Sequence, residues 1–563
     1  MGLIGDYDYK YLFLPDIPFV SKEMKTQPFF GLDSDVPIFL GFVLGFQHAL
    51  AMLGGIVTPP ITISSSFNFS TELLEYAISV SLIMSAIFTF VQITRFRVYK
   101  TPYHIGTGIL SVVGTSFATL TVVQKGVPLM YESGICSKDG DKKLPCPDGY
   151  GYVLGTSCVC GLLEMLIAFI PIPVLQRIFP AVVTGPVVLM IGISLIQDGF
   201  TDWAGGSDCK SSETCGKSHP LPWGSAEFIG LGFSVYVTII ICERWGAPIM
   251  KSCAVIIGLL VGCIIAAACG YFSHGQIDTA PVATFMWVHT FKLRVWGPLV
   301  LPFLAVYLIL AMEAIGDITA TSDVSRLEIE GPVYDSRIQG GVLADGLSGV
   351  LSGLFMTTNM STLAQNNGVI SITKCANRTV GYWCVFFLII MGIFAKFAGA
   401  IISIPKCVFG GMTSFLFTSV AVSGLKIISS CEFTRRDRFV LTATLVPGFG
   451  SILVPTWFDH VFTYKGNNNA LRGFLDAIVL VMETSYAIGG FIGVIVNLII
   501  PQVEDDVEDI NELALETVGS ADQRAVELYR SQEENKLASI SSANFDARNN
   551  HSKNYAIETV HPQ

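Results

Sequence analysis

Apolar runs long enough to cross a lipid bilayer recur along this chain and constrain its fold more than any other feature. Examples are "PIFLGFVLGFQHALAMLGGIV", "SCAVIIGLLVGCIIAAACGYF", "GPLVLPFLAVYLILAMEAIGD" and "GYWCVFFLIIMGIFAKFAGAII". A helix needs about 20 apolar residues to span the hydrocarbon core. Only 14% of the 563 residues are charged, whereas soluble domains carry about 25%. The sequence therefore predicts an all-α polytopic membrane protein.

The apolar runs and the polar breaks between them predict about fourteen transmembrane segments, of which the third and tenth are short and interrupted by Gly. The predicted ranges are 36–57, 75–94, 108–123, 151–170, 181–197, 226–242, 250–270, 298–316, 338–356, 366–376, 380–402, 405–425, 438–455 and 474–500. Residues 1–35 are expected to form a cytosolic N-terminal segment, and the absence of a basic and apolar leader argues against a signal peptide.

Basic residues in the short loops predict the orientation. "RFRVYK", "TRRDR" and the other basic loops all fall on one side if the N-terminus is cytosolic, as the positive-inside rule requires. An even number of segments then places both termini in the cytosol. The opposite side receives the sequon at Asn68 and two polar loops with paired cysteines, Cys136 with Cys146 and Cys209 with Cys215. Disulfides within these loops and glycosylation of Asn68 remain open.

Weak internal similarity suggests that the chain consists of two halves. "GILSVVGT" at 108–115 resembles "GVISITKC" at 368–375, and "PAVVTG" at 180–185 resembles "PKCVFG" at 405–410. Halves of seven segments each would enter the membrane from opposite sides, giving a 7+7 inverted repeat over residues 36–270 and 298–500. Inverted repeats with paired broken helices are typical of secondary transporters, and the broken helices mark the binding site.

The stretch "AQNNGVISITKC" contains the most unusual polar cluster. A half-helix that begins near Gln365 leaves its first N–H groups unpaired and its positive dipole end inside the membrane. These groups, with the side chains of Gln365 and Asn366, are suited to holding a ligand. Phe117 is expected to begin the other half-helix and to stack on a planar ligand, although a core role is also open. The alternative for the cluster is a polar turn that only stabilises helix packing.

Acidic residues inside predicted membrane segments are candidates for the functional site, because ionisable groups are costly at membrane depth. Glu313 and Asp317 lie one helical turn apart and share a face, which suits proton uptake, although Asp317 could lie at the cytosolic end instead. Asp345 is a candidate for proton coupling or conformational support. Glu164 and Glu483 are weaker candidates, with an ion pair or a domain-interface role as the default.

Gln47 and His48 lie in the middle of the first segment, where both need polar partners. Glu313 is the expected partner of His48, and structural support and proton coupling are equally compatible with it. No Cys/His spacing typical of a metal site and no nucleophile–base pair occurs in the sequence. We therefore expect neither an enzyme nor a metal or organic cofactor, but a proton as coupling ion. Nothing in the sequence suggests nucleic-acid binding.

These residue types together indicate the ligand class. A carboxylate accepts N–H groups, an amide both donates and accepts, and an aromatic ring offers a stacking face. This set fits a flat heterocycle edged with N–H and C=O groups. A sugar would need more hydroxyl partners, and an inorganic anion would need Arg or Lys.

The motifs also carry a family resemblance. "QNNGVISITK" (365–374), "QH" in the first segment, "AMEAIGD" in the eighth and "LADG" in the ninth occur in order. With "GLIGDYDY", "CERWGAPIMKSC" and "CGYFSH", the chain resembles the nucleobase–ascorbate transporter (nucleobase-cation symporter 2) family over about residues 1–500, and most of all the fungal uric acid–xanthine permeases. Lys374 stands where those members often have Arg, and Gln365 in place of Pro argues against the ascorbate branch.

The resemblance implies proton-coupled uptake of xanthine and uric acid by a homodimer with an elevator-like motion. It implies a core domain of segments 1–4 and 8–11 and a gate domain of segments 5–7 and 12–14. The roles it implies for single residues are as follows: Glu313 and Gln365 hydrogen-bond the purine, Phe117 stacks on it, the backbone near Ala364 and Ser116 adds contacts, and Asn366, Asp345, Asp317 and His48 support binding and coupling.

The chain from residue 501 to 563 differs in character from the rest. It contains 13 Asp or Glu and 5 Lys or Arg and few aromatic residues, which predicts a largely disordered cytosolic tail that trafficking or ubiquitylation machinery could recognise. The expected location is the plasma membrane. An anion carrier of the same architecture and a sensor that no longer transports are the alternatives.

Overall fold

The structure is a computed structural model that describes most of the chain as far as Pro501. The described residues are 7, 9–14, 29–140, 142–206, 214–215, 220–272, 275–329, 331–363, 365–455, 457–458, 460–462 and 469–501. Residues up to Glu432 and from Asp437 to Ile499 belong to one compact unit, whereas Phe433–Arg436 and residues 500–563 form a second. The predicted disordered tail lies outside the described residues, apart from Pro501.

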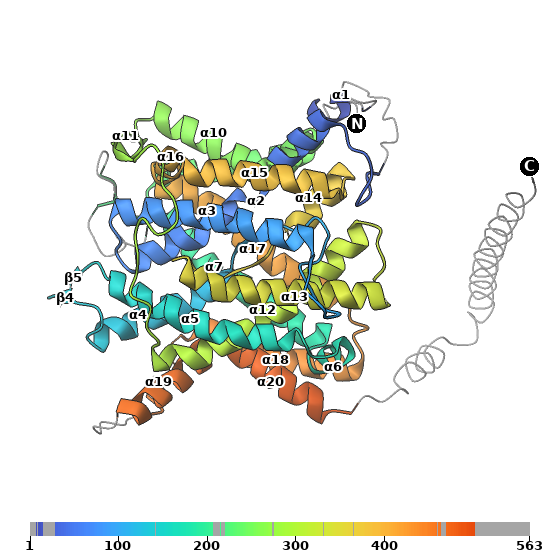
Figure 1. Ribbon diagram of the computed structural model, residues 1–563. Helices are drawn as coiled ribbons and strands as arrows, with labels where there is room; N and C mark the ends of the chain where they lie inside the picture. The colour runs from blue at the N-terminus through green and yellow to red at the C-terminus, as the bar shows by residue number, and fades with distance from the viewer. Residues whose placement is uncertain are drawn as a thin grey trace, which may run out of the picture. The chain divides into compact units, whose positions relative to one another are not determined.

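Helices make up nearly all of the first unit (Figure 1). Those of the first half are α1 (Tyr9–Phe13), α2 (Ile38–Ser66), α3 (Thr71–Thr94), α4 (Phe117–Glu132), α5 (Pro147–Ile167), α6 (Ile172–Ile178), α7 (Ala181–Trp203), α8 (Ala226–Trp245), α9 (Pro248–Ser252), α10 (Ala254–Ala268) and α11 (Gly275–Thr279). Those of the second half are α12 (Gly297–Val324), α13 (Pro332–Leu354), α14 (Gln365–Thr373), α15 (Arg378–Ile393), α16 (Ala395–Ile402), α17 (Lys406–Ser429), α18 (Arg435–Leu453), α19 (Asn469–Glu483) and α20 (Ser485–Ile499).

The helices confirm a polytopic α-helical membrane protein. Seven of the described helices are long and apolar enough to cross a membrane, and two bent pairs, α15 with α16 and α19 with α20, bring the number to nine. Every one of the fourteen predicted ranges overlaps a helix. The number of fourteen spans and the inverted repeat remain predictions, because length and composition alone identify fewer segments.

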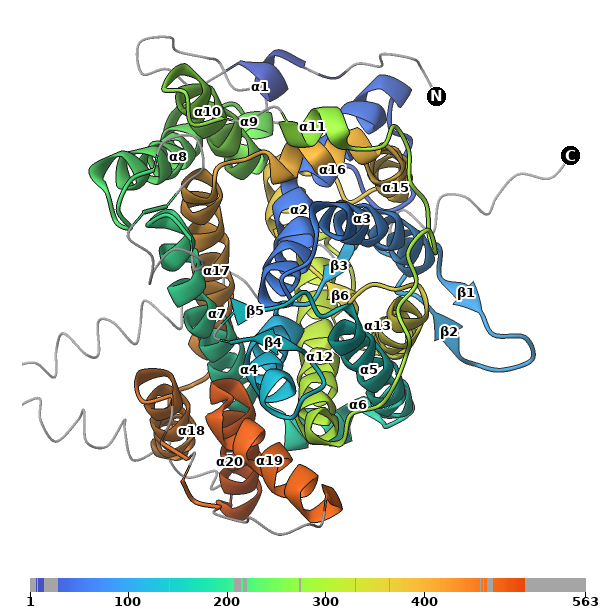
Figure 2. The same ribbon diagram turned by 90° about the vertical axis from the view of Figure 1, so that its left-hand side faces the viewer.

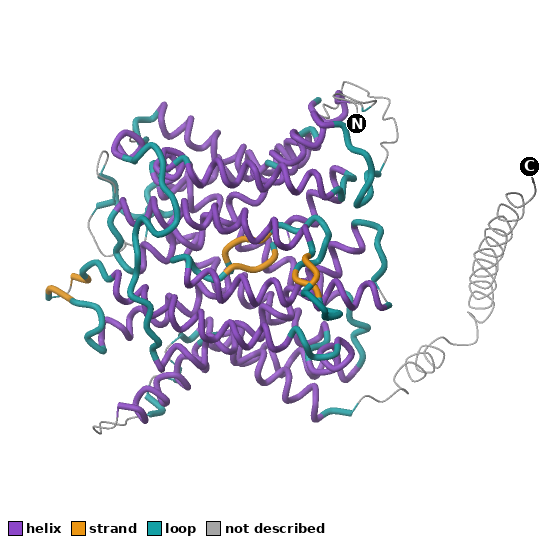
Figure 3. Tube along the Cα trace, viewed as in Figure 1, coloured by secondary structure: helices purple, strands orange, loops and turns teal. Residues whose placement is uncertain are grey.

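Two short strands meet in the middle of the helices. β3 (Val113–Thr115) pairs antiparallel with β6 (Met360–Thr362), with Gly114 opposite Ser361. The pair lies at the centre of the bundle, surrounded by helices (Figures 2 and 3). α4 follows β3 and α14 follows β6, so each of these segments consists of an extended piece and a half-helix. Both predicted breaks are therefore present.

The structure corrects two details of the prediction for this region. First, the third segment was predicted over 108–123; its half-helix begins at Phe117, as predicted, and the residues before it are not helical. In addition, the sequence similarity aligned 108–115 with 368–375. The structure instead places an extended stretch at the first position and the end of α14 at the second. The strands that pair with each other are 113–115 and 360–362, and their sequences show little similarity.

Side chains of α3 satisfy backbone groups of β3, as a strand buried at membrane depth requires, and a side chain of β3 bonds to the backbone of α2. The Thr89 hydroxyl accepts the N–H of Val113 at 2.9 Å, and the Ser85 hydroxyl donates to the Val113 carbonyl. The Thr115 hydroxyl donates to the carbonyls of Gly55 and Ile56 in α2. These hydroxyl groups fix the strand to its neighbours without using any charge.

Small residues allow the strands and helices to approach closely. A Cβ atom on Gly114 would lie 2.7 Å from a methyl carbon of Leu363, so this position of β3 requires glycine. Between α7 and α17, a Cβ on Gly192 would lie 2.3 Å from the backbone nitrogen of Ala421, and one on Gly424 would lie 2.3 Å from that of Leu189. Packing through glycine is typical of membrane helices, and here it joins α7 tightly to α17.

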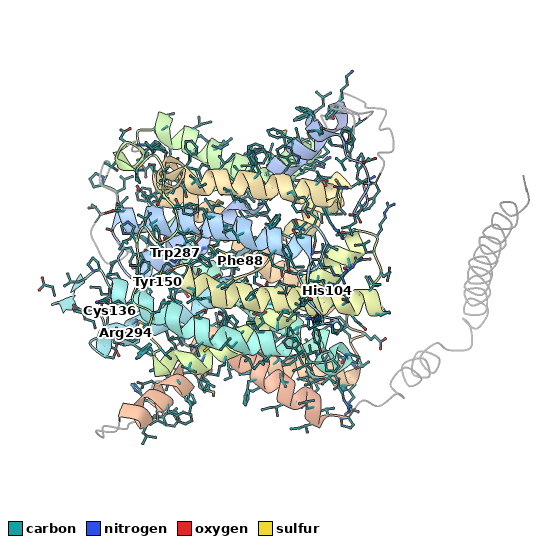
Figure 4. All side chains as sticks on the ribbon, in the orientation of Figure 1. Phe88, His104, Cys136, Tyr150, Trp287 and Arg294 are labelled. Carbon is teal, nitrogen blue, oxygen red and sulfur yellow. A yellow bond between two sulfur atoms is a disulfide. The ribbon has the colours of Figure 1, made fainter. Side chains whose placement is uncertain are left out.

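The two ends of the bundle carry different features. Cys136 and Cys146 form a disulfide in the loop that contains β4 (Lys138–Asp139) and β5 (Lys142–Lys143). The Asn68 side chain donates to the Lys143 carbonyl at the same end. Cys215 is also disulfide-bonded, whereas Cys209 lies outside the described residues. At the opposite end, β1 (Phe96–Arg97) pairs with β2 (His104–Ile105) in a basic loop, and Figure 4 shows Cys136 and His104 far apart at these two ends.

Candidate functional site

A small cavity lies where the two half-helices begin. It has a volume of about 40 Å³ and is lined by side chains of α4, α7, α12, α14 and α17 and of the stretch before α14. The lining residues are Phe117, Val188, Glu313, Asp317, Thr362, Leu363, Gln365, Val420, Ser423 and Ile427. Four predicted site residues, Glu313, Gln365, Phe117 and Asp317, therefore meet around one cavity although they lie far apart in the sequence.

The α14 side of the cavity is polar. α14 begins at Gln365, as predicted, and the side-chain carbonyl oxygen of Gln365 is buried. Among the described residues none donates a hydrogen bond to that oxygen. Burying a polar group without a partner is unfavourable, so Gln365 is suited to receive a ligand donor. Thr362 and Leu363 also line the cavity, whereas the neighbouring Ala364, a predicted contact, lies outside the described residues.

The α4 side of the cavity is apolar. α4 begins at Phe117, with Ser116 as its N-cap residue. The Phe117 ring is 8% exposed and meets the Phe417 ring of α17 edge to face, with 5.8 Å between the ring centroids. The edge-to-face contact fixes the orientation of the Phe117 ring, so that a face of the ring is available to stack on a ligand in the cavity. Ser116 is buried beside it but does not line the cavity, and its hydroxyl has no hydrogen-bond partner in the described part of the chain.

Asp345 does not line the cavity but accepts hydrogen bonds from β6, the strand that leads to α14. Its Oδ2 atom accepts a hydrogen bond from the Ser361 hydroxyl at 2.7 Å, and its Oδ1 atom accepts one from the Thr362 N–H at 3.0 Å. The side chain is buried in α13. Because hydrogen bonds to a carboxylate are stronger than neutral ones, Asp345 fixes the approach to Gln365 without lining the cavity itself.

His48 supports α14 from α2. Its Nδ1 atom lies 3.0 Å from the Asn366 Oδ1 atom, and the Asn366 amide donates to the Leu110 carbonyl at 2.5 Å. Both side chains are fully or almost fully buried. The prediction that Glu313 is the partner of His48 is wrong, because the half-helix itself brings Asn366 into that position. Gln47 is buried next to His48, and neither atom of its amide group has a partner among the described residues.

Three further candidates, Lys374, Glu164 and Glu483, do not line the cavity. Lys374 is exposed, follows the end of α14 in a left-handed conformation with φ of 53°, and does not line the cavity. Glu164 of α5 is completely buried, and the described residues offer it neither a basic partner nor a hydrogen bond that meets normal geometry. Of its two default roles, the ion pair is therefore wrong, whereas the domain-interface role stays a prediction. Glu483 ends α19 and does not line the cavity.

Metal binding has no support in the described part of the chain, which contains no group of three or more His, Cys, Asp or Glu side chains placed to hold an ion. What the cavity offers is two carboxylates on one helix, an amide that both donates and accepts, and an aromatic ring. Its lining contains no Lys or Arg. This arrangement is chemically suited to a flat molecule with N–H donors at its edge.

Comparison with known proteins now adds the family. Residues 41–457 match the model of the Permease family (Xan_ur_permease). The chain belongs to this permease family. The motifs "QNNGVISITK", "AMEAIGD" and "LADG" all lie within the matched range, so the resemblance expected from them is confirmed at the family level. The permease is accordingly a multi-pass transport protein and not an enzyme.

Two fungal relatives are similar to this permease over almost their whole length. A purine permease of Emericella nidulans is 56% identical over 523 residues, which cover 91% of this chain and 90% of the relative. A uric acid-xanthine permease of the same fungus is 55% identical over 528 residues, which cover 93% of this chain and 91% of the relative.

A solved structure shares the fold of the permease. The murine Solute Carrier 26 family member A9 anion transporter, in the inward-facing state, matches with a TM-score of 0.50 at 10% identity. The match covers 74% of this chain and 66% of that one, so the permease spans just under two thirds of that transporter. At this identity the likeness concerns the fold alone.

The sequence did not predict the wall of the permease cavity opposite the half-helices. Val188 of α7 and Val420, Ser423 and Ile427 of α17 form that wall. A signal was present, because "PAVVTG" and "PKCVFG" begin these two helices, each capped by a Pro. A second cavity of about 290 Å³ with an almost wholly apolar lining shares Val188 and Glu313 with the first.

Proposed function

We propose that the protein imports purines, xanthine and uric acid in the first place, together with protons across the plasma membrane. The observation that carries this proposal is the cavity in which Phe117 and Gln365, the first residues of two half-helices, meet Glu313 and Asp317. The names of the two fungal relatives support the substrate class, and the chemistry of the cavity agrees with it independently.

The substrate contacts follow from donor and acceptor chemistry. A purine dione presents N–H groups along one edge, which Glu313 accepts as a carboxylate. Gln365 accepts another N–H with its free carbonyl oxygen and donates its amide hydrogens to a ring carbonyl. Phe117 covers one face of the ring. Backbone groups near Ser116 and Ala364 complete the contacts, since the first N–H groups of both half-helices lack partners within the helix.

Proton coupling follows from the acidic side chains around the cavity. Glu313, Asp317 and Asp345 lie within the membrane region, where uncompensated charge is costly. A bound proton neutralises the Glu313 carboxylate, whereas a substrate that donates N–H groups stabilises its negative charge. Proton binding and substrate binding at Glu313 therefore influence each other. His48 and Asn366 hold the half-helix in place during this exchange. Gln47, buried beside His48, and Lys374, which follows α14, are further residues that we assign to the support of coupling.

The proposed mechanism is an elevator-like motion of a core domain against a gate domain. The core consists of α2–α5 and α12–α16, and the gate of α7–α10 and α17–α20, which together make fourteen spans in a 7+7 inverted repeat. One wall of the cavity comes from core helices and the other from α7 and α17, so sliding of the two domains would expose the site on alternate sides. In a homodimer, contact between the two gate domains would keep them fixed while each core domain moves.

The orientation that we propose has both termini in the cytosol. The basic loop around His104 would face the cytosol, and the loop with the Cys136–Cys146 disulfide the outside, where disulfides persist. The acidic tail, which could be recognised for trafficking or ubiquitylation, would then also be cytosolic.

Uptake of radiolabelled xanthine tests the proposal in cells that lack their own purine permeases. We expect saturable uptake that uric acid competes with strongly, and hypoxanthine, adenine, uracil and ascorbate weakly. Collapse of the proton gradient by a protonophore should reduce uptake, whereas replacement of sodium should not. An anion carrier of the same fold would respond to sulfate or bicarbonate instead. A sensor would bind xanthine without accumulating it.

Two substitutions test the site itself. Glu313→Ala and Gln365→Ala should abolish uptake while the amount of protein at the cell surface stays normal. Glu132→Ala, which changes an exposed carboxylate at the far end of α4, is the matched control and should leave uptake unchanged. Normal xanthine uptake by either site variant would reject the assignment.

A further inference from the structure

Glu164 is the most unusual acidic residue outside the cavity. It lies in α5 with 0% of its side chain exposed, and both carboxylate oxygens are fully buried without a hydrogen-bond donor among the described residues. An isolated ionised carboxylate is strongly unfavourable in such surroundings. The neutral acid avoids this cost, but its O–H group then needs an acceptor.

Asp345 is the neighbour that supplies the acceptor. Asp345 directly precedes Gly346, where α5 and α13 approach closely: an added Cβ on Gly346 would lie 2.7 Å from the Met165 nitrogen and 3.0 Å from the Glu164 carbonyl carbon. Asp345 already accepts one hydrogen bond on each oxygen. A carboxylate oxygen has a second lone pair, so Asp345 remains able to accept an O–H from Glu164.

The other groups around Glu164 do not neutralise a negative charge. The acidic groups around it are Glu313 of α12 and Asp345 of α13, of which Asp345 is followed by Gly346 at the close contact with α5. Tyr307 of α12 also lies near, but its hydroxyl is engaged with the Ser157 hydroxyl at 2.8 Å. Cys160, one turn earlier in α5, is uncharged as a thiol. No described basic side chain therefore forms an ion pair with Glu164.

We propose that Glu164 carries the coupling proton of this permease, in a pair with Asp345. In the loaded state the Glu164 carboxylic acid donates its O–H to the Asp345 carboxylate, which in turn holds Ser361 and Thr362. When the proton leaves to water, two adjacent carboxylates remain. Their repulsion weakens the hold of Asp345 on β6 and thus moves the start of α14 at Gln365. This inference rests on the proposed function, because it assigns the proton of that transport cycle.

Two substitutions at Glu164 separate proton release from simple hydrogen bonding. Glu164→Gln keeps an N–H donor for Asp345 but has no proton to release. We expect it to retain exchange of internal for external xanthine, and to lose about tenfold or more of proton-driven accumulation, within the usual range of coupling. Glu164→Leu removes the donor as well and should lose both. Glu75→Gln is the matched control, since Glu75 is also buried but lies in α3 near Lys396.

Infrared difference spectroscopy of the purified protein gives a readout that does not depend on transport. The wild type should show the C=O band of a buried protonated carboxylic acid that disappears at high pH. The band should be absent in Glu164→Gln and unchanged in Glu75→Gln. Glu164→Asp serves as a second variant if the amide does not fold: it should shift the band and keep accumulation proton-dependent.

Three results would overturn the proposal. Normal proton-driven accumulation by Glu164→Gln would show that the proton is carried elsewhere. Equal loss of exchange and accumulation in the Gln and Leu variants would show that Glu164 only packs the helices. An unchanged infrared band in Glu164→Gln would show that Glu164 is not the protonated group. If the wild type failed to transport xanthine, the proposed function would fall, whereas the infrared result would still decide whether Glu164 holds a proton.

Discussion

The two broken segments at the centre of the permease have the same plan but differ in what holds them. We call β3 with α4 the α4 arm, and β6 with α14 the α14 arm. The half-helix of the α4 arm has 16 residues and begins with an aromatic side chain, whereas that of the α14 arm has 9 residues and begins with an amide. A short half-helix has few backbone hydrogen bonds of its own, so the α14 arm depends more on outside support.

The supports of the two arms differ in chemistry. Uncharged hydroxyl groups hold the α4 arm: Thr115 donates to carbonyls of α2, and Thr89 accepts the N–H of Val113. Ionisable groups hold the α14 arm, with Asp345 on β6 and His48 on Asn366. Under the proposed function, this difference would make the α4 arm a fixed stacking surface and would let the position of the α14 arm respond to protonation.

The largest effect is expected for Asp345→Ala, which removes the charged support of the α14 arm. Hydrogen bonds to a charged group are worth about 1.5–3 kcal/mol each, so the loss of two corresponds to at least about 3 kcal/mol, or about a hundredfold in xanthine uptake. Uptake per molecule at the cell surface measures this. Asp335→Ala, at the exposed start of the same helix, is the control. If Asp345→Ala took up xanthine about as well as the wild type, the α14 arm would not depend on its charged support, and the proposed difference between the arms would be wrong.

A smaller effect is expected for Phe117→Ala, which removes the stacking surface of the α4 arm. Loss of an aromatic contact of about 1.5 kcal/mol raises the KM for xanthine about tenfold, while the maximal rate of uptake and its dependence on pH stay close to those of the wild type. Phe117→Tyr keeps the ring and should keep the KM. A changed pH dependence in Phe117→Ala would mean that the α4 arm also responds to protons.

Thr115→Val tests the neutral support of the α4 arm and should cost less again. The substitution keeps the shape of the side chain and removes its hydrogen bonds to Gly55 and Ile56, with a loss of about 1 kcal/mol in the free energy of unfolding. Thermal unfolding of the purified protein in detergent measures this loss. Xanthine uptake at permissive temperature should be normal. A loss of uptake as large as that of Asp345→Ala would show that both arms need equally exact support.

Local sequence patterns were sufficient to predict most of the fold. The apolar runs located the helices, and Gly with polar residues located both breaks, because these features report directly on solvation by lipid and on helix formation. The β3–β6 pairing was not predicted. A strand of three residues such as Val113–Thr115 has no periodicity of its own, and only contact with Leu363 and Ile56 explains why Gly114 is needed there.

The candidate site was predicted in part for the same reason. Glu313, Gln365 and Phe117 are conspicuous in their local sequence, and they do meet at one cavity. The partners of His48 and Glu164 depend on how distant helices pack, which a single sequence does not report. The expected pairing of His48 with Glu313 was therefore wrong, and the ion pair that was one of two default roles for Glu164 is not provided by its surroundings.

The smallest effect concerns His104, in the loop that leads to the α4 arm. Burial, with the nearby charges of Arg95 and Arg97, lowers the pKa of His104. The folded protein therefore binds a proton at His104 less readily than the unfolded chain, whose His pKa is about 6.5. Stability at this group is complete above that pH and is lost as the pH falls through it. His104→Gln should reduce the fall in the melting temperature between about pH 7.5 and about pH 5.5 by about 1–2 °C.

His104→Gln also tests whether the proton response belongs to the α14 arm alone. His104 contacts Ser336 and Gln339 of α13 near the membrane surface, so its titration acts on the folding of the loop and not on the cavity. Proton-dependent xanthine uptake by His104→Gln should therefore equal that of the wild type, even though the pH dependence of its melting temperature changes. If uptake instead lost its proton dependence, His104 would control that dependence. Because His104 lies in the loop before the α4 arm, the proton response could then not be assigned to the α14 arm.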